Sequence, residues 1–273
     1  MRNIRIVTLY SGSSGNSTYV KIGDTAILID AGKSARTLCS RLVEIGSDIK
    51  EIKAIFITHE HTDHISALET LSKKNPIPIH MTEKSAERFD RCPDAAIHRC
   101  LVRHTPVFSE RVGELEVSSF VTPHDSKMSV GYRIEFEDGG ERHAVGLATD
   151  IGYVSCDIKE GLDGCEAVVL ESNHDVDMLK EGPYPYDLKQ RILSKRGHLS
   201  NSECASFAID LAERGTKAFI LAHLSEENNE PSVAFDEVSS AVSGLGACVF
   251  VAEADNPTEL VLRCSSEEIY DKR

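Results

Sequence analysis

The sequence lacks the features of a membrane protein or an exported protein. None of its apolar runs approaches the ~20 residues that a helix needs to cross a bilayer. Residues 1–5 lead directly into a strand-like pattern, without the apolar segment and cleavage site of a secretory signal. We therefore expect a cytoplasmic protein with no membrane partner.

Paired cysteines are also lacking. The chain contains 8 cysteines, but none of them stands in a Cys-x-x-Cys pair. In a chain without an export signal, scattered cysteines are more often buried thiols than a disulfide framework. We therefore expect reduced and mostly buried cysteines that act as small hydrophobic residues.

Positive charge is scarce. The chain has 30 Lys and Arg against 44 Asp and Glu, which gives a net charge of −14. This balance excludes a general nucleic-acid coat protein, which would need a basic surface. It does not exclude a nuclease, because bound divalent cations and a local basic patch can attract phosphate on their own.

Internal repeats, low-complexity stretches and obvious linkers are absent as well. The chain of 273 residues is long enough for one large α/β domain or two small ones, and one domain over residues 1–273 is the simplest prediction.

Short apolar runs separated by turn residues predict many strands. They lie at residues 4–9, 18–22, 25–29, 54–57, 77–79, 115–121, 130–136, 143–147, 167–170, 218–221, 247–251 and 259–262. Helical patterns cover residues 35–45, 200–214 and 230–242. The Asp-Gly-Gly turn at 138–140 predicts a hairpin between the strands on either side. Such an order predicts packed sheets with helices outside.

Residues 58–64 carry the most informative pattern, Thr-His-Glu-His-Thr-Asp-His. Its imidazole and carboxylate groups suit zinc, iron or manganese. The pattern follows the apolar run 54–57, and the end of a buried strand is a rigid place to mount ligands. We predict a metal site here. The alternative is a hydrophilic loop that happens to be rich in histidine.

The same arrangement recurs along the chain. Apolar runs end on metal-binding side chains at Asp30, His59, His124, Asp150 and His223. One such residue alone is more often a capping or surface residue. Their recurrence predicts that the ligands converge if these strand ends meet at one edge.

These residues resemble the metallo-β-lactamase superfamily. Its H-x-H-x-D-H signature is present at 59–64, and further motifs match at residues 28–32, 122–125, 148–152 and 221–224. The resemblance runs from Tyr10 to about Asn229. It implies an α/β fold, namely a four-layer αββα sandwich with a dinuclear metal site at the sheet edges.

A closer resemblance is to the YycJ/WalJ group of that superfamily. It rests on residues 11–17, 171–175, 197–201 and 221–229. The group implies a 5′→3′ DNA exonuclease linked to mismatch repair, with DNA as substrate and DNA-repair proteins as partners. Between Asp150 and His223 there is no insertion long enough for the β-CASP domain of larger nucleases.

The superfamily pattern implies two divalent metal ions per chain, zinc or manganese, with iron also suited. The implied ligands are His59, His61 and His124 for one ion, Asp63, His64 and His223 for the other, and Asp150 as the bridge. A hydroxide shared by the ions would attack phosphorus, with Asp63 and Asp150 as catalytic residues. Asp30 would fix the histidine loop through hydrogen bonds, or would be an ordinary turn residue.

His198 is a further catalytic candidate. It lies just before the helix predicted at 200–214, and a helix N-terminus favours anions. In nuclease branches of the superfamily a histidine in a comparable place contacts the phosphate or protonates the leaving oxygen, so the resemblance implies that role for His198. The alternative is a polar loop residue.

Several residues are candidates for substrate contact. They are Ser14 and Asn16 in a Gly- and Ser-rich loop, His174, and Lys189, Arg191 and Arg196 in the densest basic segment. The loop could be an anion nest or a tight turn near the metals. His174 could make a structural hydrogen bond instead, and the basic segment, with Tyr184 and Tyr186 nearby, could be a solvated helix face.

Four functions fit these residues to different degrees. A metal-dependent phosphodiesterase, foremost a DNA exonuclease, is the leading prediction. A hydrolase of a small ester, thioester or lactam and a cyclic-phosphate diesterase are the enzymatic alternatives. A non-catalytic metal-binding module is the least favoured, because every ligand of the two-metal set is present.

Overall fold

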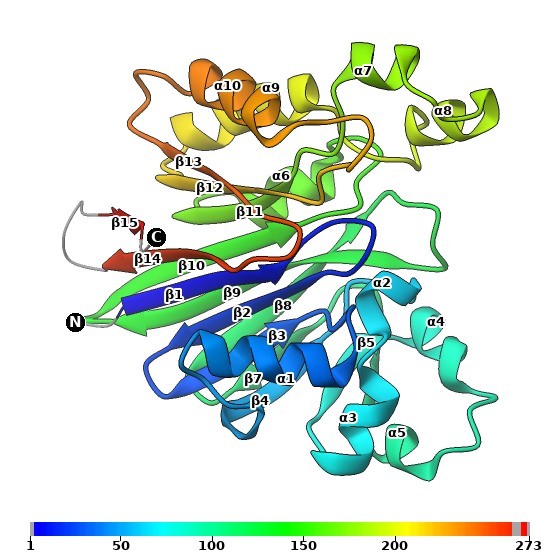
Figure 1. Ribbon diagram of the computed structural model, residues 1–273. Coiled ribbons are helices and arrows are strands. Elements are labelled where there is room, and N and C mark those ends of the chain that lie inside the picture. The colour runs from blue at the N-terminus through cyan, green and yellow to red at the C-terminus, as the bar shows by residue number, and fades with distance from the viewer. Residues whose placement is uncertain (1–2, 264–268, 272–273) are drawn as a thin grey trace.

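Two packed β-sheets form the centre of the molecule. The computed structural model describes residues 3–263 and 269–271. The eight-stranded sheet has the order β15-β14-β1-β2-β3-β4-β5-β6, and the seven-stranded sheet has the order β13-β12-β11-β10-β9-β8-β7 (Figure 1).

The bounds of the described elements are as follows. The strands are β1 Asn3–Tyr10, β2 Ser17–Ile22, β3 Thr25–Ile29, β4 Ile52–Phe56, β5 Ile79–Thr82, β6 Leu101–His104, β7 Ser109–Val112, β8 Leu115–Thr122, β9 Ser129–Asp138, β10 Glu141–Ala148, β11 Ala167–Glu171, β12 Ala218–Ala222, β13 Cys248–Val251, β14 Thr258–Arg263 and β15 Ile269–Asp271. The α-helices are α1 Ala35–Glu44, α2 Thr62–Ile65, α3 Leu68–Lys74, α4 Glu83–Ala86, α5 Ala95–Cys100, α6 Cys156–Leu162, α7 Val176–Glu181, α8 Tyr186–Ile192, α9 Asn201–Glu213 and α10 Pro231–Ala241, and the 3-10 helices are η1 Ile49–Glu51 and η2 Glu87–Phe89.

Apolar side chains on both faces of each sheet hold four layers together. Between the sheets, Ile27 of β3 and Ile220 of β12 belong to one buried cluster. Successive strand residues point to opposite faces, so Leu28 joins a second cluster under α1, α3 and α5. Phe219 joins a third cluster under α6, α9 and α10. The predicted αββα sandwich is confirmed.

Strand direction brings several strand ends to one side. Strands β3 to β6 run parallel to one another in the first sheet, and β10 to β13 do so in the second. Strand β8 runs in the same direction as β10, because both are antiparallel to β9. The carboxyl ends of parallel strands form the usual binding edge of a sheet.

Several local predictions are confirmed. Strands β9 and β10 form the predicted hairpin. Helices α9 and α10 lie within the helical ranges predicted at 200–214 and 230–242; α9 begins with a capping box of Ser200 and Glu203, and α10 begins at Pro231. The cysteines of the described part are unpaired as predicted. Their burial is mixed, however, since Cys156 and Cys248 are exposed.

One strand prediction was misplaced. The run 77–79 was expected to be a strand, but β5 begins only at Ile79. Pro76 and Pro78 have no amide hydrogen to donate to a neighbouring strand, so regular pairing starts after them.

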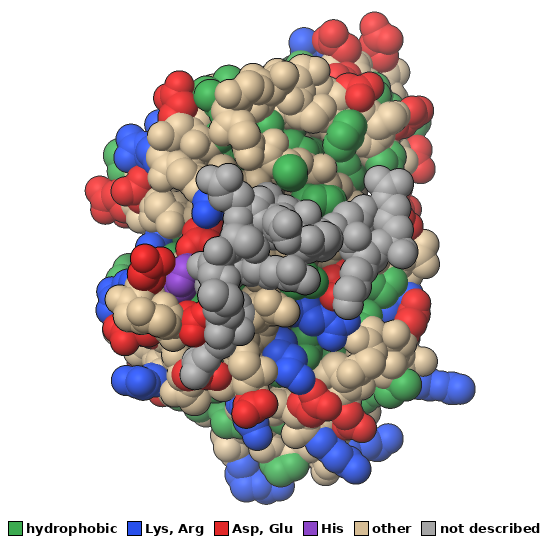
Figure 2. Space-filling model, turned by 90° about the vertical axis from the view of Figure 1, so that its left-hand side faces the viewer, with side chains coloured by type: hydrophobic (Ala, Val, Ile, Leu, Met, Phe, Trp, Pro, Cys, Tyr) green, Lys and Arg blue, Asp and Glu red, His purple; other side chains and the backbone are tan. Residues whose placement is uncertain are grey.

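On one face of the molecule, charges of the two signs are mixed rather than sorted. Figure 2 shows the face on the left-hand side of Figure 1, away from α7 and α8. Where grey atoms do not cover it, acidic and basic side chains are interspersed. None of the helices in the described ranges combines the length and the apolar character needed to span a bilayer.

Candidate metal centre

The candidate metal centre lies beyond the strand ends that the sequence pointed to. Asp30 follows β3, His59 follows β4, His124 follows β8, Asp150 follows β10 and His223 follows β12. The sequence predicted that the strands run up to these residues, but each strand ends before its residue. The side chains therefore stand on loops at the rim of the sandwich.

Backbone conformation explains where three of these strands end. Asp30, Asp150 and His223 have φ angles of 62°, 57° and 57°, and within the described ranges they are the non-glycine residues with positive φ. A left-handed residue cannot continue a strand, and such strain concentrates at functional sites. The turn directs these three side chains to the centre.

Asp30 organises the histidine loop. Its buried carboxylate accepts hydrogen bonds from the Thr58 amide and the Thr58 hydroxyl, both at 2.9 Å. The Nδ1 of His64 lies 2.8 Å from the same carboxylate. A ring that donates from Nδ1 presents Nε2 to a metal, so the contacts match the positioning role expected for Asp30.

Other rings of the centre are oriented in the same way. His124 Nδ1 lies 3.2 Å from the carbonyl oxygen of Gly197. His223 Nδ1 lies 3.2 Å from the carboxylate of Glu171, and His59 Nδ1 lies 3.1 Å from Thr58 Oγ1. Each ring thus keeps Nε2 free for the centre.

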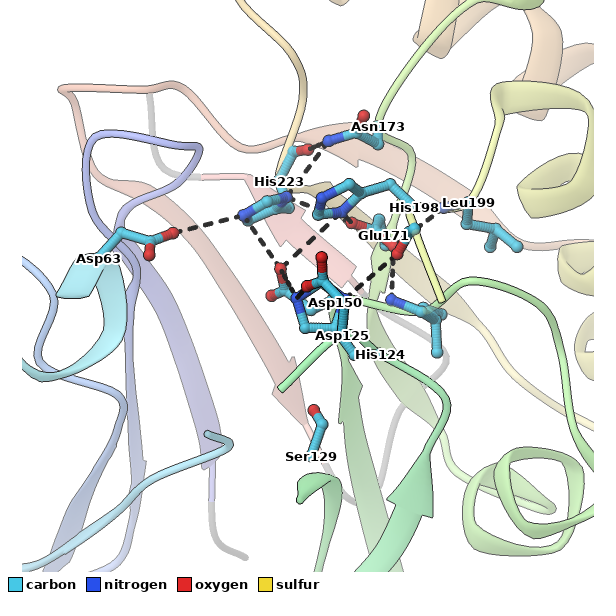
Figure 3. A network of polar contacts seen from close by, with 12 residues as sticks. Asp63, His124, Asp125, Ser129, Asp150, Glu171, Asn173, His198, Leu199 and His223 are labelled. Carbon is cyan, nitrogen blue, oxygen red and sulfur yellow. Dashed lines mark hydrogen bonds and ion pairs between the residues drawn. The ribbon is translucent and has the colours of Figure 1, made fainter. Parts of the chain in front are cut away.

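Asp150 stands in the middle of this arrangement. Its carboxylate oxygens lie 3.3 Å from His64 Nε2, 3.5 Å from His223 Nε2 and 3.6 Å from His124 Nε2. On the other side, Asp63 reaches from the N-terminal part of the chain toward His223, at 3.8 Å (Figure 3). The side chain of Asp150 is therefore central enough to bridge two ions.

Polar atoms without partners indicate what the centre is built to hold. Within the described part of the chain, His59 Nε2, Asp150 Oδ2 and His223 Nε2 are buried and have no hydrogen-bond partner. Leaving such atoms unpaired is costly unless something binds them. Ligand atoms within 4.8 Å of one another form the sets His59, His61, His124 and Asp63, His64, His223. The donors thus fit two divalent ions.

The electrostatics of the centre also demand positive charge. Burial disfavours the charged carboxylate of Asp150, but His223 and His64 outweigh it and hold its pKa well below the usual range. Burial likewise opposes the charged ring of His223, but the nearby carboxylates of Asp150, Asp63 and Glu171 outweigh it and raise its pKa to about 10. Metal ions would supply this charge in place of the ring protons.

Glu171 is a central residue to which the sequence assigned no role. It is fully buried at the end of β11, and its Oε1 lies 2.8 Å from His198 Nδ1. Its Oε2 accepts hydrogen bonds from the amides of Ile151 and Leu199, at 2.8 and 3.1 Å. Glu171 therefore ties His198 to His223 and to the loop after β10 (Figure 3).

The contact with Glu171 sets the charge of His198. Burial disfavours the charged ring, but the Glu171 carboxylate outweighs it and raises the pKa of His198. With Nδ1 bound to Glu171, the Nε2 side of the ring is left for a substrate, and 22% of the side chain is exposed. A position at the end of an apolar strand was the signal that could have pointed to Glu171.

The Gly- and Ser-rich loop contributes to the centre through Asn16. The Asn16 side chain lies 3.3 Å from Asp63 and 3.1 Å from His64 Nε2, and it exchanges hydrogen bonds with the backbone of Gly12. Ser14 is turned outward and accepts a hydrogen bond from Lys33 at 3.1 Å. Asn16 therefore supports the metal-facing residues, whereas Ser14 lies at the surface.

The basic segment lies on and after α8, next to the centre. Arg191 forms an ion pair with Asp125, and the Arg196 guanidinium donates to the carbonyl oxygen of His124 at 3.2 Å. Lys189 donates to the carbonyl oxygen of Lys180 at 2.7 Å. The two arginines are thus brought to the centre, whereas Lys189 is tied to α7.

A small cavity opens beside His198. Its volume is about 200 Å³, and its lining includes Tyr184, Arg191, His198, His223 and Ser225. Helix α8 forms one wall, so the basic segment and the candidate acid face the same space.

His174 is buried away from that cavity lining. Within the described residues neither of its ring nitrogens has a hydrogen-bond partner. Its backbone carbonyl accepts from the Asn201 amide at 2.9 Å, and the residue forms an isolated β-bridge with Ser200. Among the described residues the side chain therefore lacks the structural hydrogen bond that the sequence left open, and the substrate contact stays a prediction.

Comparison with known proteins agrees with this geometry. The family model described as "Beta-lactamase superfamily domain" matches residues 25–224. An exodeoxyribonuclease YycJ from Bacillus anthracis is 35% identical over 247 residues, which cover 87% of this chain and 89% of that protein. An exodeoxyribonuclease WalJ from Streptococcus pneumoniae is 34% identical over 248 residues, with the same coverage of 87% and 89%.

Structural comparison gives the same fold. The metallo-β-lactamase fold protein YhfI from Bacillus subtilis superposes with a TM-score of 0.70 at 17% identity, over 95% of this chain and 100% of that chain. The chain belongs to the metallo-β-lactamase superfamily and, within it, to the group that contains the exodeoxyribonucleases YycJ and WalJ.

Proposed function

We propose that the protein is a metal-dependent phosphodiesterase that removes nucleotides from the 5′ end of DNA. The observation that carries the proposal is the Glu171–His198 pair, in which His198 Nδ1 lies 2.8 Å from a Glu171 carboxylate oxygen. The pair lies next to the donor sets for two ions. A positioned acid beside two cations is suited to an oxygen leaving group on phosphorus. The names of the YycJ and WalJ relatives support DNA as the substrate.

The metal-binding roles follow from the donor sets. His59, His61 and His124 would hold one ion, Asp63, His64 and His223 the other, and Asp150 both. When bound, the two ions supply a hydroxide nucleophile at neutral pH and positive charge for the phosphoryl oxygens. Asp30 keeps the histidine loop in place for them.

The chain's own residues then manage the protons. The Asp63 carboxylate would accept a hydrogen bond from the attacking hydroxide and so orient it toward phosphorus. His198, charged because Glu171 raises its pKa, donates the Nε2 proton to the leaving 3′ oxygen. Glu171 stabilises the charged ring before the transfer and holds its tautomer.

The walls of the cavity support a nucleic-acid substrate. Tyr184 lines the cavity, and Tyr186 is 74% exposed on α8, so both rings are available for stacking on bases. Arg191 lines the same space, although a phosphate would have to compete with Asp125 for it. Arg196 supports the loop of His124 and offers its charge from there.

A small cyclic phosphodiester is the second candidate substrate. The cavity volume of about 200 Å³ favours a compact ligand. The net charge of −14 also suits a small substrate, since extended duplex DNA would meet a largely acidic protein.

Cleavage of one DNA sequence in two topologies tests the proposal. The protein is incubated with a linear single strand and with the covalently closed circle of the same sequence, in zinc or manganese. An exonuclease degrades the linear strand and leaves the circle intact. Cleavage of the circle would replace the proposal by an endonuclease, and hydrolysis of a cyclic dinucleotide with both DNAs intact would favour the second candidate.

Finer features of the proposal rest on the sequence. The native metal is proposed to be zinc or manganese, with iron as a further alternative, because imidazole and carboxylate donors suit all three ions. The cytoplasmic location, DNA-repair partners and the single domain over 1–273 stay predictions.

A further inference from the structure

A second group of metal-binding side chains lies outside the centre. His80 of β5, His104 of β6 and Glu110 of β7 offer ligand atoms that all lie within 4.8 Å of one another. The group shares no residue with the donor sets of the centre. Strands β6 and β7 are the edge strands of the two different sheets. The group therefore joins the two sheets where the sandwich closes.

Ring stacking holds the two imidazoles in place. His80 stacks on Phe56 with ring centroids 4.7 Å apart, and His104 stacks on Phe108 at 3.9 Å. The imidazoles lie against each other at 5.2 Å, with His80 Nδ1 and His104 Nε2 only 3.0 Å apart. Two imidazole nitrogens on one tetrahedral zinc ion are about 3.3 Å apart, so a small shift would let both bind it.

Both imidazoles are in the form that binds metal. Burial, together with the neighbouring His104, lowers the pKa of His80 to about 4, and burial lowers the pKa of His104. Neutral rings have a lone pair to donate. Glu110 is half-buried and adds a carboxylate to the pair.

We propose that His80, His104 and Glu110 bind a zinc-type divalent cation that clamps the edge strands of the two sheets together. Two imidazoles and one carboxylate are a known ligand set for zinc, with water in the fourth position. The ion replaces the hydrogen bond between the two neutral rings by two metal–nitrogen bonds. Because an ion bound by both sheets favours the folded state, it stabilises the sandwich at this end.

Zinc binding by four forms of the full chain tests the proposal. The wild type, Glu110→Gln, His104→Ala and His98→Ala are equilibrated at micromolar free zinc, and the zinc content per chain is measured. His98 is exposed and lies outside the group, so His98→Ala controls for the loss of any surface histidine. His104→Ala should bind one zinc ion fewer than the wild type, and Glu110→Gln should need more zinc to fill the site. DNA cleavage by both variants should be unchanged.

Two features make the outcome decisive. The loss of one ion is a difference between variants, so it does not depend on how many ions the centre binds or on what it cleaves. Glu110→Gln keeps the shape of the side chain and leaves the ring stack intact. Its zinc binding therefore tests the proposal even if His104→Ala fails to fold. Its zinc concentration at half-saturation should rise by about tenfold or more.

A second readout is thermal unfolding. Added zinc should raise the melting temperature of the wild type more than that of Glu110→Gln. Equal zinc content, equal half-saturation and equal melting shifts in the wild type and Glu110→Gln would overturn the proposal. The group would then be a hydrogen-bonded pair of rings packed between two phenylalanines.

Discussion

Loss of any one ligand of the metal centre is expected to disable the whole centre. His59→Ala removes a buried ring whose Nε2 has no hydrogen-bond partner in the described structure, and Asp63→Ala removes a carboxylate beside His64 and His223. Each should lower turnover more than about 10³-fold, since loss of one donor to a transition-state charge already costs about 10²–10³-fold.

Metal analysis and DNA cleavage rates check this prediction. Both variants should bind less metal than the wild type, whereas His98→Ala, at an exposed histidine, should keep metal and rate. Full activity in either variant of the centre would contradict the assigned ligand sets.

His198 is predicted to act on the leaving oxygen rather than on metal. His198→Ala should keep the metal content and slow cleavage by about 10²–10⁴-fold, the usual contribution of a general acid. A DNA with sulfur in place of the leaving 3′ oxygen needs no protonation, so it should restore much of the rate in His198→Ala but not in Asp63→Ala. Equal slowing on both DNAs would contradict the acid role.

Glu171 is predicted to set the pH range of activity. It raises the pKa of His198, and the charged ring is the active form, so activity persists below that pKa and falls as pH rises through it. Glu171→Gln removes the negative charge, so the alkaline limb of the pH–rate profile should move to lower pH by about 1–3 units. The test is to measure the cleavage rate across pH for the wild type and for Glu171→Gln. If the alkaline limb stays at the same pH and only the maximal rate falls, Glu171 has a purely structural role.

At the residue scale, most residues of the metal centre could be predicted from the sequence, but not all of them. The strand-end pattern and the 59–64 motif pointed to the residues that the structure brings together. Glu171 was missed because a glutamate at the end of a strand is ordinary on its own. Its link to His198 joins residues far apart in the sequence, so only the folded arrangement reveals it.

At the scale of elements, helix α9 is predicted to depend on its capping box. Ser200 accepts a hydrogen bond from the Glu203 amide, and the Glu203 side chain accepts one from the Ser200 amide. Ser200→Ala should lower the free energy of unfolding by about 1 kcal/mol. Denaturant unfolding measures this free energy. The matched control is Ser206→Ala, at an exposed serine of the same helix, which should change the free energy of unfolding little.

Regular elements with a strong period were predicted well, and short ones were not. Strands of the two sheet centres stood out because they are buried on both faces and nearly continuously apolar. Edge strands β6 and β7 carry charged residues and escaped notice. Helices such as α2 and α4 have four residues each, too few for a helical period to be visible.

At the scale of the whole molecule, the sandwich could be predicted through the family resemblance but not from the local patterns alone. The central core unites β1 to β4 with β8 to β12, and those pairings are set by burial between distant segments. The acidic charge excluded a nucleic-acid coat protein and left open a nuclease with a local site, which is where the arginines of the basic segment lie.

The most direct test of the account is a time course of DNA cleavage with the label at one end or the other. A single strand labelled at its 5′ end, and the same strand labelled at its 3′ end, are digested in zinc or manganese beside Asp63→Ala. The account predicts that the 5′ label is released at once as a mononucleotide, that the 3′-labelled strand shortens stepwise, and that Asp63→Ala does neither. Intact DNA with both metals, or shortening from the 3′ end, would contradict it.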